Sequence, residues 1–552
     1  MLRGKRAGIF LIALLVVSAL IGGIYGPAVR ARDTGTTSME QSVETFSNVL
    51  AVVEHDYAEP VKVNSAVYDG AIPGMLAVLD PHSTFFDAKQ FALLREDQNG
   101  RYFGVGMQIA SFGRRVVVIE PFPGSPAYKA GVRPGDVIVE VDGKSCKGLG
   151  VTEVANLLKG PRDTVVHVGV EREGWNEPLE FTITRQEIPH ASVDYYTELR
   201  PGIGYIHIMT FESEETADEL AAAMKKLDAS HLQGLILDLR DNPGGLLNQA
   251  VKVGDMFLDK GQLIVSHRGR NSPEQRYYAL HGNGGDRVPI VVLVNGNTAS
   301  ASEIVSGALQ DHDRGLIAGT TTFGKGLVQT VTQLSYGTGL ALTTARYYTP
   351  SDRLIQRPYQ NISYWEYRYD PQPAPKPKAY LTDSGRTVYG GGGITPDDKI
   401  PAPELNAFQT KLFRAGVFFP PMSNSPLEIG VGDFTRSLLG KRPAISSDFT
   451  VDQGVIDDFE QFLTRQHISY TPQDIQANLD WLKWQIKREV FTSVFGSDAG
   501  FKVDLDHDAQ VQQAMTLIPQ ARALYATARK VLREHAALLG PAPITSATAA
   551  KH

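Results

Sequence analysis

The sequence is poor in the residues that build disulfides and metal sites. Cys146 is the only cysteine among 552 residues, so the chain cannot close a disulfide on itself and relies on packing for its stability. It contains no HExxH motif, no paired CxxC motif and no phosphate-binding P-loop. These motifs carry zinc-dependent hydrolysis and nucleotide chemistry. We therefore expect a protein without a metal or any other cofactor.

The chain also lacks a strong excess of positive charge. It has 54 Lys and Arg against 61 Asp and Glu, which gives a net charge of −7. A nucleic-acid partner normally requires a basic face, so no such partner is expected. The hydrophobic content of 42% and the charged content of 21% are those of a globular protein. At roughly 150 residues per domain, the length predicts about three or four domains.

One long hydrophobic run lies at the N-terminus. Arg3, Lys5 and Arg6 precede a charge-free stretch at 7–29, and cleavage could follow Ala31. This order is typical of an export signal, and a run of roughly 20 residues is also long enough to span a bilayer. Residues 1–31 are therefore predicted to be a signal peptide or a membrane anchor. The rest of the chain would be exported, in the periplasm or at the periplasmic face of the inner membrane.

Ser300 and Lys325 form a candidate catalytic pair. The serine follows an apolar run at 290–294, which predicts a buried strand, and precedes a helix-forming stretch at 301–310. At such a junction, free backbone N–H groups can stabilise an oxyanion. A lysine can take the proton of a serine if burial lowers its pKa. Taken singly, the two residues would equally suit a helix cap and a surface lysine. Together they indicate a Ser-Lys hydrolase.

The first half of the exported chain divides into two units. Residues 38–98 are predicted to be a helical module, because apolar residues recur at helical spacing from Val43 to Val53. Residues 99–186 contain short alternating strands around the motif at 124–143, Gly-Ser-Pro-Ala to Val-Asp-Gly. This motif resembles the PDZ domain, which binds an extended C-terminal tail as an added strand. By that resemblance the loop that holds the tail carboxylate is Phe103, Gly104, Val105, Gly106 and Met107.

The unit at 187–403 carries the expected chemistry. A buried strand is predicted at 234–240, followed by a turn that contains Gly244 and Gly245, whose backbone N–H groups can approach a ligand closely. Strand-like runs alternate with helical ones, which predicts an α/β core. Residues 404–540 are predicted to be a helical region for packing or oligomerisation, with Thr471 and Pro472 at the start of one helix. Residues 541–552 are predicted to be a disordered tail.

The ordered motifs resemble those of the C-terminal processing peptidases, also called tail-specific proteases. The resemblance covers about 40–400 and includes the segments at 79–83, 239–245, 299–304, 322–326 and 391–397. It implies a crotonase/ClpP-like peptidase core with an inserted PDZ domain. It also implies a role for each of several residues: Ser300 as nucleophile, Lys325 as general base, Gln329 as the residue that orients the lysine, Ala301 with Gly244 or Gly245 as oxyanion hole, and Glu303, Asp311 and Thr322 as supporting residues.

The resemblance also implies partners. Protein substrates would be held by their C-terminal tails, and the PDZ domain would gate activity. An adaptor protein, anchoring in the inner membrane and homo-oligomerisation through the C-terminal helices are further candidates. The chain departs from the family at Lys159, where an arginine is usual, so coupling of the PDZ domain to the active site through that arginine is not expected to carry over.

Three alternatives remain open on the sequence. A non-catalytic PDZ scaffold of the cell envelope would need the same tail-binding loop. A Ser-His-Asp triad could use His312 or His82, although the chain has no GxSxG elbow. A crotonase-like acyl-CoA enzyme would also use the N–H groups of a glycine turn, but export and a PDZ domain argue against it.

Overall fold

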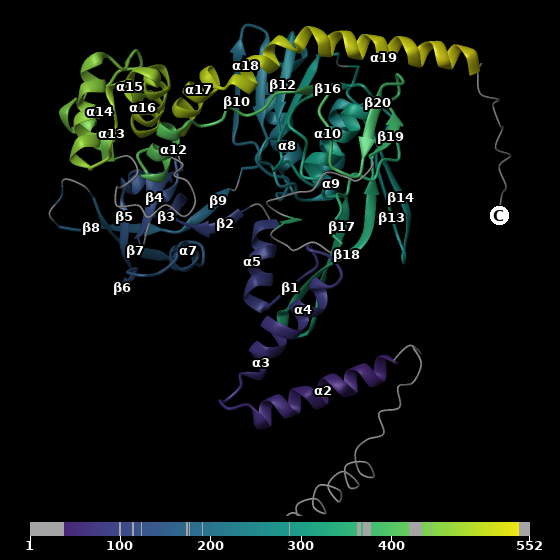
Figure 1. Cartoon of the computed structure of the whole chain (residues 1–552), viewed down its shortest axis with the longest axis horizontal. Coiled ribbons are helices and arrows are strands. Elements are labelled where there is room, and N and C mark those ends of the chain that lie inside the picture. Colours follow the sequence, from purple (N-terminus) through teal and green to yellow (C-terminus); the bar gives the residue numbers. More distant parts are fainter. Residues whose placement is uncertain are drawn as a thin grey trace, which may run out of the picture. The chain divides into compact units, whose positions relative to one another are not determined.

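The computed structural model describes residues 38–539, except 99–100, 113–114, 123, 173–174, 176, 190, 286, 361–365, 368–376, 419–432 and 443 (Figure 1). The predicted export segment at 1–31 and the predicted disordered tail at 541–552 therefore lie outside the described residues. The chain divides into two compact units, Met1–Gly74 and Met75–His552. Each unit is described by itself below.

The described part of the first unit is helical, as predicted. It consists of α2 (Met39–Asp56), α3 (Val63–Ser65), the π-helical turn η1 (Ala66–Ala71) and the start of α4 (Ile72–Ala77). Ser38 and Gln41 begin α2 with a reciprocal capping box, because each side chain bonds the other's backbone. No residue of α2 is buried, and Val43, Phe46 and Val49 are exposed on it. The apolar spacing in the sequence thus produces a helix whose apolar side chains stay exposed.

Near its start, the second unit contains a strand that the sequence did not predict. The turn at 79–83 leads into β1 (Thr84–Phe86), which pairs antiparallel with β18 (Gly339–Tyr348), and α5 (Ala88–Gln98) follows. The predicted helical module at 38–98 therefore contains a short strand near its end. The pairing partner lies more than two hundred residues away, so local periodicity could not indicate it.

The part of the second unit from Arg101 to Pro189 is a sheet with two short helices. Its strands run in the order β3-β4-β5-β7-β8, with β6 paired to β5 and a separate β2–β9 pair. Valines at alternating positions along its strands are buried and fill its core, among them Val118, Val141 and Val166. Strand β3 pairs with β4 on one side and lies at the edge of the sheet. The bounds are β2 (Arg101–Gly104), β3 (Met107–Phe112), β4 (Arg115–Pro121), α6 (Pro126–Ala130), β5 (Val137–Val141), β6 (Lys144–Ser145), α7 (Val151–Leu158), β7 (Val165–Glu171), β8 (Leu179–Thr184) and β9 (Gln186–Pro189).

A large six-stranded sheet forms the core and is covered by helices on both faces. Its strands run in the order β10-β11-β12-β15-β16-β21, and all neighbours from β11 onward are parallel. Alternate strand residues such as Leu235 and Leu237 pack on helices α8 to α10, whereas Ile236 and its neighbours pack on α18 and α19. Figure 1 shows α18 and α19 on one side of these strands and α8 to α10 on the other. This is the predicted α/β core. The bounds are β10 (Tyr195–Arg200), β11 (Ile203–His207), α8 (Thr216–Lys226), η2 (Ala229–His231), β12 (Gly234–Asp238), α9 (Leu247–Phe257), β15 (Ile290–Val294), α10 (Ala301–Asp311), β16 (Gly315–Gly319) and β21 (Asp398–Lys399).

A second, antiparallel sheet lies beside the helices of the core. It contains β1, β18, β13 and β14 in that order, and β17 pairs with β18. Strand β17 begins two residues after Lys325, so this sheet positions the lysine. The bounds are β13 (Leu263–Gly269), β14 (Ser272–Tyr278), β17 (Leu327–Gln333) and η3 (Ser335–Gly337), and a separate hairpin is formed by β19 (Lys378–Leu381) and β20 (Thr387–Gly390).

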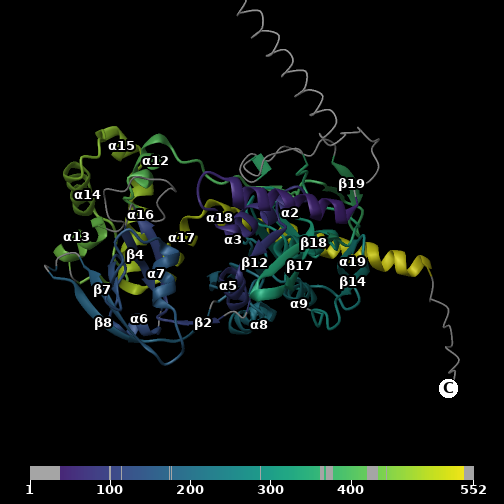
Figure 2. The ribbon, with the colours of Figure 1, turned by 90° about the horizontal axis from the view of Figure 1, so that it is seen from below.

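The C-terminal region is helical, as predicted. Thr471 caps α15 and Pro472 is its first residue, and Ile475, Leu482 and Ile486 are buried in a core of aromatic and aliphatic side chains. The last helices, α18 and α19, pack instead on the large sheet. In Figures 1 and 2, α17 lies between α16 and α18. The bounds are α12 (Ala407–Arg414), α13 (Asp433–Lys441), α14 (Gln453–Arg465), α15 (Pro472–Ala477), α16 (Leu479–Phe495), α17 (Ser497–His507), α18 (Ala509–Thr516) and α19 (Ile518–Leu539).

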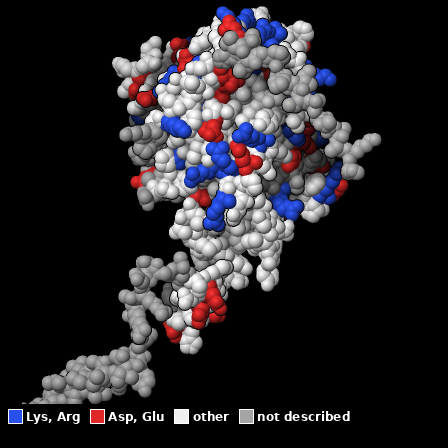
Figure 3. Space-filling model, turned by 90° about the vertical axis from the view of Figure 1, so that its right-hand side faces the viewer, with Lys and Arg blue, Asp and Glu red and all other residues white. Residues whose placement is uncertain are grey.

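The surface and the helices show two further properties. On the face drawn in Figure 3, basic and acidic side chains are intermixed. Among the described residues, no helix combines the length and the apolar character that crossing a membrane requires.

Candidate active site

Ser300 lies at the junction that the sequence predicts. Strand β15 ends at Val294 and helix α10 begins at Ala301, so the serine directly precedes the helix. Its backbone has φ 55° and ψ −114°, a conformation that a residue with a side chain rarely adopts. Such strain persists only where the surroundings impose it, and here the Ala299 N–H is held by the Asn242 carbonyl at 3.0 Å. The strained turn presents a half-buried hydroxyl at a helix N-terminus.

Glu303 joins the serine loop to the lysine loop. Its side chain is completely buried, and Oε2 accepts from the backbone N–H groups of Ser300 and Lys325, each at 2.9 Å. Oε1 accepts from the Thr322 hydroxyl at 2.5 Å and from the Gly324 N–H at 2.8 Å. Burial raises the pKa of Glu303 to about 7, although these hydrogen bonds oppose the rise. Two of the predicted supporting residues, Glu303 and Thr322, are thus brought together beside the pair.

Lys325 is half-buried and has a defined partner. Its Nζ donates to Gln329 Oε1 at 3.2 Å, and Gln329 Nε2 donates to the His82 carbonyl at 2.5 Å. Burial lowers the pKa of Lys325, opposed by the charges of Glu303 and Asp80. The direction is the one that a general base needs. Among the described residues, the Ser300 hydroxyl and the Lys325 amine are not hydrogen-bonded to each other, so proton transfer requires a closer approach.

The glycine turn lies directly against Ser300. A Cβ atom on Gly244, whose φ is +95°, would lie 2.6 Å from the Ala299 carbonyl oxygen and 2.7 Å from Ser300 Cβ. The Gly244 N–H already donates to Asn242 Oδ1 at 2.9 Å. Within the described chain, neither the Gly245 N–H nor the Ala301 N–H has a hydrogen-bond partner. The sequence left the choice of glycine open, and the structure leaves the N–H of Gly245 available.

Asp311 is not brought to the pair. It ends the helix that Ser300 begins, roughly 16 Å away at 1.5 Å per residue. There it accepts from the Arg353 guanidinium at 2.5 Å and from the Ser351 hydroxyl at 2.7 Å. These contacts lie at the far end of α10, so the structure does not bring Asp311 to Ser300 and Lys325 as it does the other predicted supporting residues.

The two histidines considered as bases have other partners. His312 lies one residue beyond the end of α10, with Nδ1 at 2.7 Å from Asp383 Oδ2 and Nε2 at 2.7 Å from the Leu263 carbonyl. His82 is nearer the lysine, but its Nε2 is 2.8 Å from the Tyr367 hydroxyl. Neither ring is placed to take the proton of Ser300.

Tyr347 is a residue of the site that sequence reasoning missed. Its buried hydroxyl donates to the Lys325 carbonyl and lies 3.1 Å from the Ser300 carbonyl. Burial raises the pKa of Tyr347 well above its usual value, so the phenol stays protonated and can donate. The residue lies in β18 within an ordinary alternating strand pattern. Nothing in that pattern distinguishes it from a core tyrosine.

The predicted tail-binding loop is a second site of free backbone groups. Phe103 is exposed, whereas the other four predicted residues, Gly104, Val105, Gly106 and Met107, are buried. In the described structure, the N–H groups of Val105 and Gly106 have no intramolecular partner. Edge strand β3 begins at Met107, so an added strand would start beside these N–H groups. The prediction that this loop holds a tail carboxylate thus concerns backbone N–H groups that have no other partner in the described chain.

Lys159, where the sequence departs from the family, follows the last residue of α7. The carbonyls of the two residues before it, Leu157 and Leu158, accept from the buried guanidinium of Arg185, each at 2.9 Å. The described residues also contain no group of acidic, histidine or cysteine side chains that could hold a metal ion.

Comparisons with known proteins agree with this organisation. A family model described as peptidase family S41 matches 202–361, and one described as PDZ domain matches 117–172. The carboxy-terminal-processing protease of Bartonella bacilliformis is 40% identical over 359 residues, which cover 63% of this chain and 79% of that protein. The carboxy-terminal processing protease CtpA of Bacillus subtilis is 35% identical over 351 residues, which cover 63% of this chain and 74% of that protein. A solved photosystem II D1 C-terminal processing protease is 33% identical, covers 66% of this chain and 93% of its own, and has a TM-score of 0.35.

Proposed function

Because the chain belongs to peptidase family S41 and, within it, to the carboxy-terminal processing proteases, we propose that it cleaves exported proteins near their C-termini with a Ser300–Lys325 dyad. It is a serine-type peptidase that carries a PDZ domain. The observation that supports the dyad most is Glu303, whose carboxylate holds the backbone N–H groups of both Ser300 and Lys325. One buried group thus sets the positions of nucleophile and base together.

The first chemical step is attack by the serine. Ser300 Oγ bonds to the carbonyl carbon of the scissile peptide while its proton passes to the neutral amine of Lys325. The carbonyl oxygen becomes an oxyanion, which accepts hydrogen bonds from the N–H groups of Gly245 and Ala301. Each such donor is worth about 3 to 4 kcal/mol in other hydrolases.

The later steps return the enzyme to its starting state. The tetrahedral adduct breaks the C–N bond as the Lys325 ammonium protonates the leaving amine, which leaves an acyl-serine. Water then attacks that ester, again giving its proton to Lys325, and the new carboxylate departs as Ser300 regains its proton. Gln329 orients the lysine through the 3.2 Å bond to Nζ, and Tyr347 positions the backbone of both catalytic residues.

The test is the loss of turnover in variants of the dyad. We expect Ser300→Ala and Lys325→Ala to lower cleavage of an unstructured protein such as reduced casein by about 10⁴-fold or more. A fluorophosphonate probe should label the wild type at Ser300 only. The matched control is Lys252→Ala, a change on α9 outside the site. Full turnover by Lys325→Ala would refute the dyad, and a wild type that neither reacts nor cleaves would favour the PDZ scaffold.

The finer parts of the proposal rest on sequence and loop geometry. The substrate tail binds beside β3 with its carboxylate on the N–H groups of Val105 and Gly106, and binding gates activity. The core is of the crotonase/ClpP type.

Export to the periplasm or its membrane face rests on the apolar run at 7–29. Anchoring, an adaptor and self-association through the C-terminal helices are associated proposals. Cell fractionation with and without residues 1–31 tests the location, since a cytoplasmic wild type would reject it.

A further inference from the structure

Helix α17 begins on the PDZ domain and lacks a cap of its own. Gly496 precedes it and supplies no capping side chain. The missing acceptor comes from Glu120 in β4, whose Oε1 accepts from the Ser497 N–H at 3.0 Å. A carboxylate at this end is favoured because the helix dipole is positive there. The residue that caps α17 is therefore supplied from 377 positions earlier in the chain.

Glu120 is also close to the tail-binding loop. It is paired with Gln108 of β3, and the neighbouring pair is Met107 with Pro121. Two residues further along, the Phe122 N–H donates to the Gly106 carbonyl at 3.0 Å. The strand that caps α17 is thus hydrogen-bonded directly to the loop and edge strand that would receive a tail.

The middle of α17 packs on the peptidase core. The ring of Phe501 lies 4.5 Å from that of Tyr195 and 6.0 Å from that of His207, between ring centres. Three residues further along, Asp504 accepts from the Trp484 indole at 2.9 Å, and Trp484 stacks on His507. Helix α17 is thus a rod of roughly 16 Å with partners along its length.

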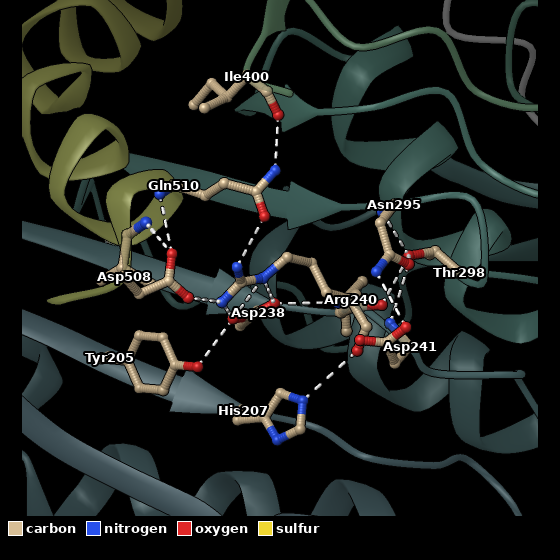
Figure 4. A network of polar contacts seen from close by, with 12 residues as sticks. Tyr205, His207, Asp238, Arg240, Asp241, Asn295, Thr298, Ile400, Asp508 and Gln510 are labelled. Atoms are coloured by element: carbon tan, nitrogen blue, oxygen red, sulfur yellow. Dashed lines mark hydrogen bonds and ion pairs between the residues drawn. The ribbon is translucent and has the colours of Figure 1, made fainter. Parts of the chain in front are cut away.

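The residues that follow α17 bond to Arg240, which lies between the end of β12 and the glycine turn. Asp508 follows the helix, and its Oδ2 pairs with the Arg240 guanidinium at 2.8 Å, while Gln510 Oε1 accepts from the same group at 2.9 Å (Figure 4). Arg240 is held on its other side by buried Asp238, which also accepts from Tyr205. Arg240 precedes Gly244 by four residues. A shift of α17 would therefore reach the backbone that carries the Gly245 N–H.

We propose that Glu120 and Asp508 are positioning residues at the two ends of α17, which couples the PDZ domain to the glycine turn beside Ser300. When the PDZ domain moves, the hydrogen bond between the Ser497 N–H and Glu120 breaks or forms again, and α17 shifts. Through its ion pair, Asp508 then shifts Arg240 and the glycine turn that follows it. This inference rests on the proposed peptidase function, and it assigns the C-terminal region a role in setting the oxyanion geometry. Lys159 need take no part in the coupling.

The test is a double-mutant cycle on the full chain with reduced casein as substrate. Asp508→Asn keeps a capping side chain for α18 but removes the ion pair with Arg240, and should lower kcat about tenfold with KM unchanged. Glu120→Ala should lower kcat about fivefold. Independent sites would multiply to about fiftyfold, whereas coupled ones should leave the double variant near tenfold. A multiplicative double variant, or a single variant with unchanged kcat, would overturn the proposal.

Two controls and a second readout accompany the cycle. Asp506→Asn removes the exposed 3.7 Å ion pair between α17 and Arg200, and Glu140→Ala removes an exposed carboxylate from the PDZ sheet. Exposed pairs of this kind contribute little, so both variants should match the wild type. Glu120→Gln keeps an acceptor oxygen and should retain most of kcat, which separates loss of the cap from misfolding. Hydrogen exchange at the amides of Leu239, Gly244 and Leu246 should quicken in Glu120→Ala and not in Glu140→Ala. Unchanged exchange there would also overturn the proposal, and since exchange needs no turnover, a failure of the dyad would be recognised separately.

Discussion

Gly245 in the turn beside Ser300, and Val105 and Gly106 in the predicted tail-binding loop at 103–107, present backbone N–H groups that have no intramolecular partner among the described residues, yet their surroundings differ. The turn is enclosed: Gly244 packs against Ser300, and buried Glu303, Tyr347 and Asp238 hold the backbone near it. The loop opens onto the edge strand β3 and carries an exposed Phe103.

The difference matches the two anions that the sites would hold. An oxyanion exists only briefly, so its donors must be in place beforehand and shielded from water. A tail carboxylate is a stable group on a flexible chain, so its donors must be reachable and must continue into a strand that the tail can join. Changes in the enclosed turn should therefore lower activity far more than changes in the open loop.

The largest effect should come from a methyl group in the turn. Gly244→Ala places Cβ within 2.8 Å of the Ala301 nitrogen and displaces the turn, because the neighbours are backbone atoms. We expect kcat/KM to fall by about 10²- to 10³-fold, the loss seen when one oxyanion donor is removed. Gly261→Ala is the matched control, since Gly261 has φ +89° and no atom within 4 Å of a Cβ. Equal losses in the two variants would show that backbone strain, not the site, is responsible.

The pH dependence should follow the lysine. The lowered pKa of Lys325 means that the base becomes neutral as pH rises, so kcat/KM should increase about tenfold per pH unit below that pKa and level off above it. Lys325→Arg keeps the positive charge and cannot lose its proton, so it should be inactive across the range. Activity that is highest in acid and falls with pH would contradict a lysine base.

Glu303 should make the stability of the fold decrease as pH rises from 4.5 to about 7. Its pKa is raised to about 7 in the folded state from an ordinary 4.5, so its contribution to stability is complete below pH 4.5 and is lost as pH rises through 7. The loss is about 3 kcal/mol at 1.36 kcal/mol per pKa unit. Urea unfolding of wild type and Glu303→Gln between pH 4 and 8 measures it. If both show the same pH slope in this range, the carboxyl does not titrate as expected.

A methyl group in the tail-binding loop should have a smaller and different effect. In Gly106→Ala the Cβ would lie 2.5 Å from Ser125 Cβ, which shifts the donors of the loop. We expect KM to rise about tenfold for a fluorogenic reporter with a free C-terminal carboxylate and to change little for the same reporter as an amide. Gly124→Ala, at φ +76° with open space, is the control. A fall in kcat for both reporters with unchanged KM would mean that the loop does not hold the tail.

Local patterns in the sequence predicted much of the fold and pointed to the candidate reacting groups. The apolar run at 290–294 and the helix after it placed Ser300 at its junction, and Thr471 with Pro472 marked a helix start that the structure confirms. These features depend on residues within a few positions of one another, which is the range over which capping and periodicity act. Strand β1 was missed because its partner β18 lies far along the chain.

The sequence by itself therefore determined the class of protein, a serine-type peptidase with a PDZ domain, and it predicted the serine, the lysine, the glycine turn and the tail-binding motif, each carried by a short segment. Only the tertiary structure decided which glycine N–H remains available, that Glu303 holds both catalytic loops, and that Asp508 reaches Arg240 across 268 positions. The physical reason is that hydrogen bonds and ion pairs between buried groups form wherever the fold brings donors and acceptors within about 3 Å, regardless of their separation along the chain.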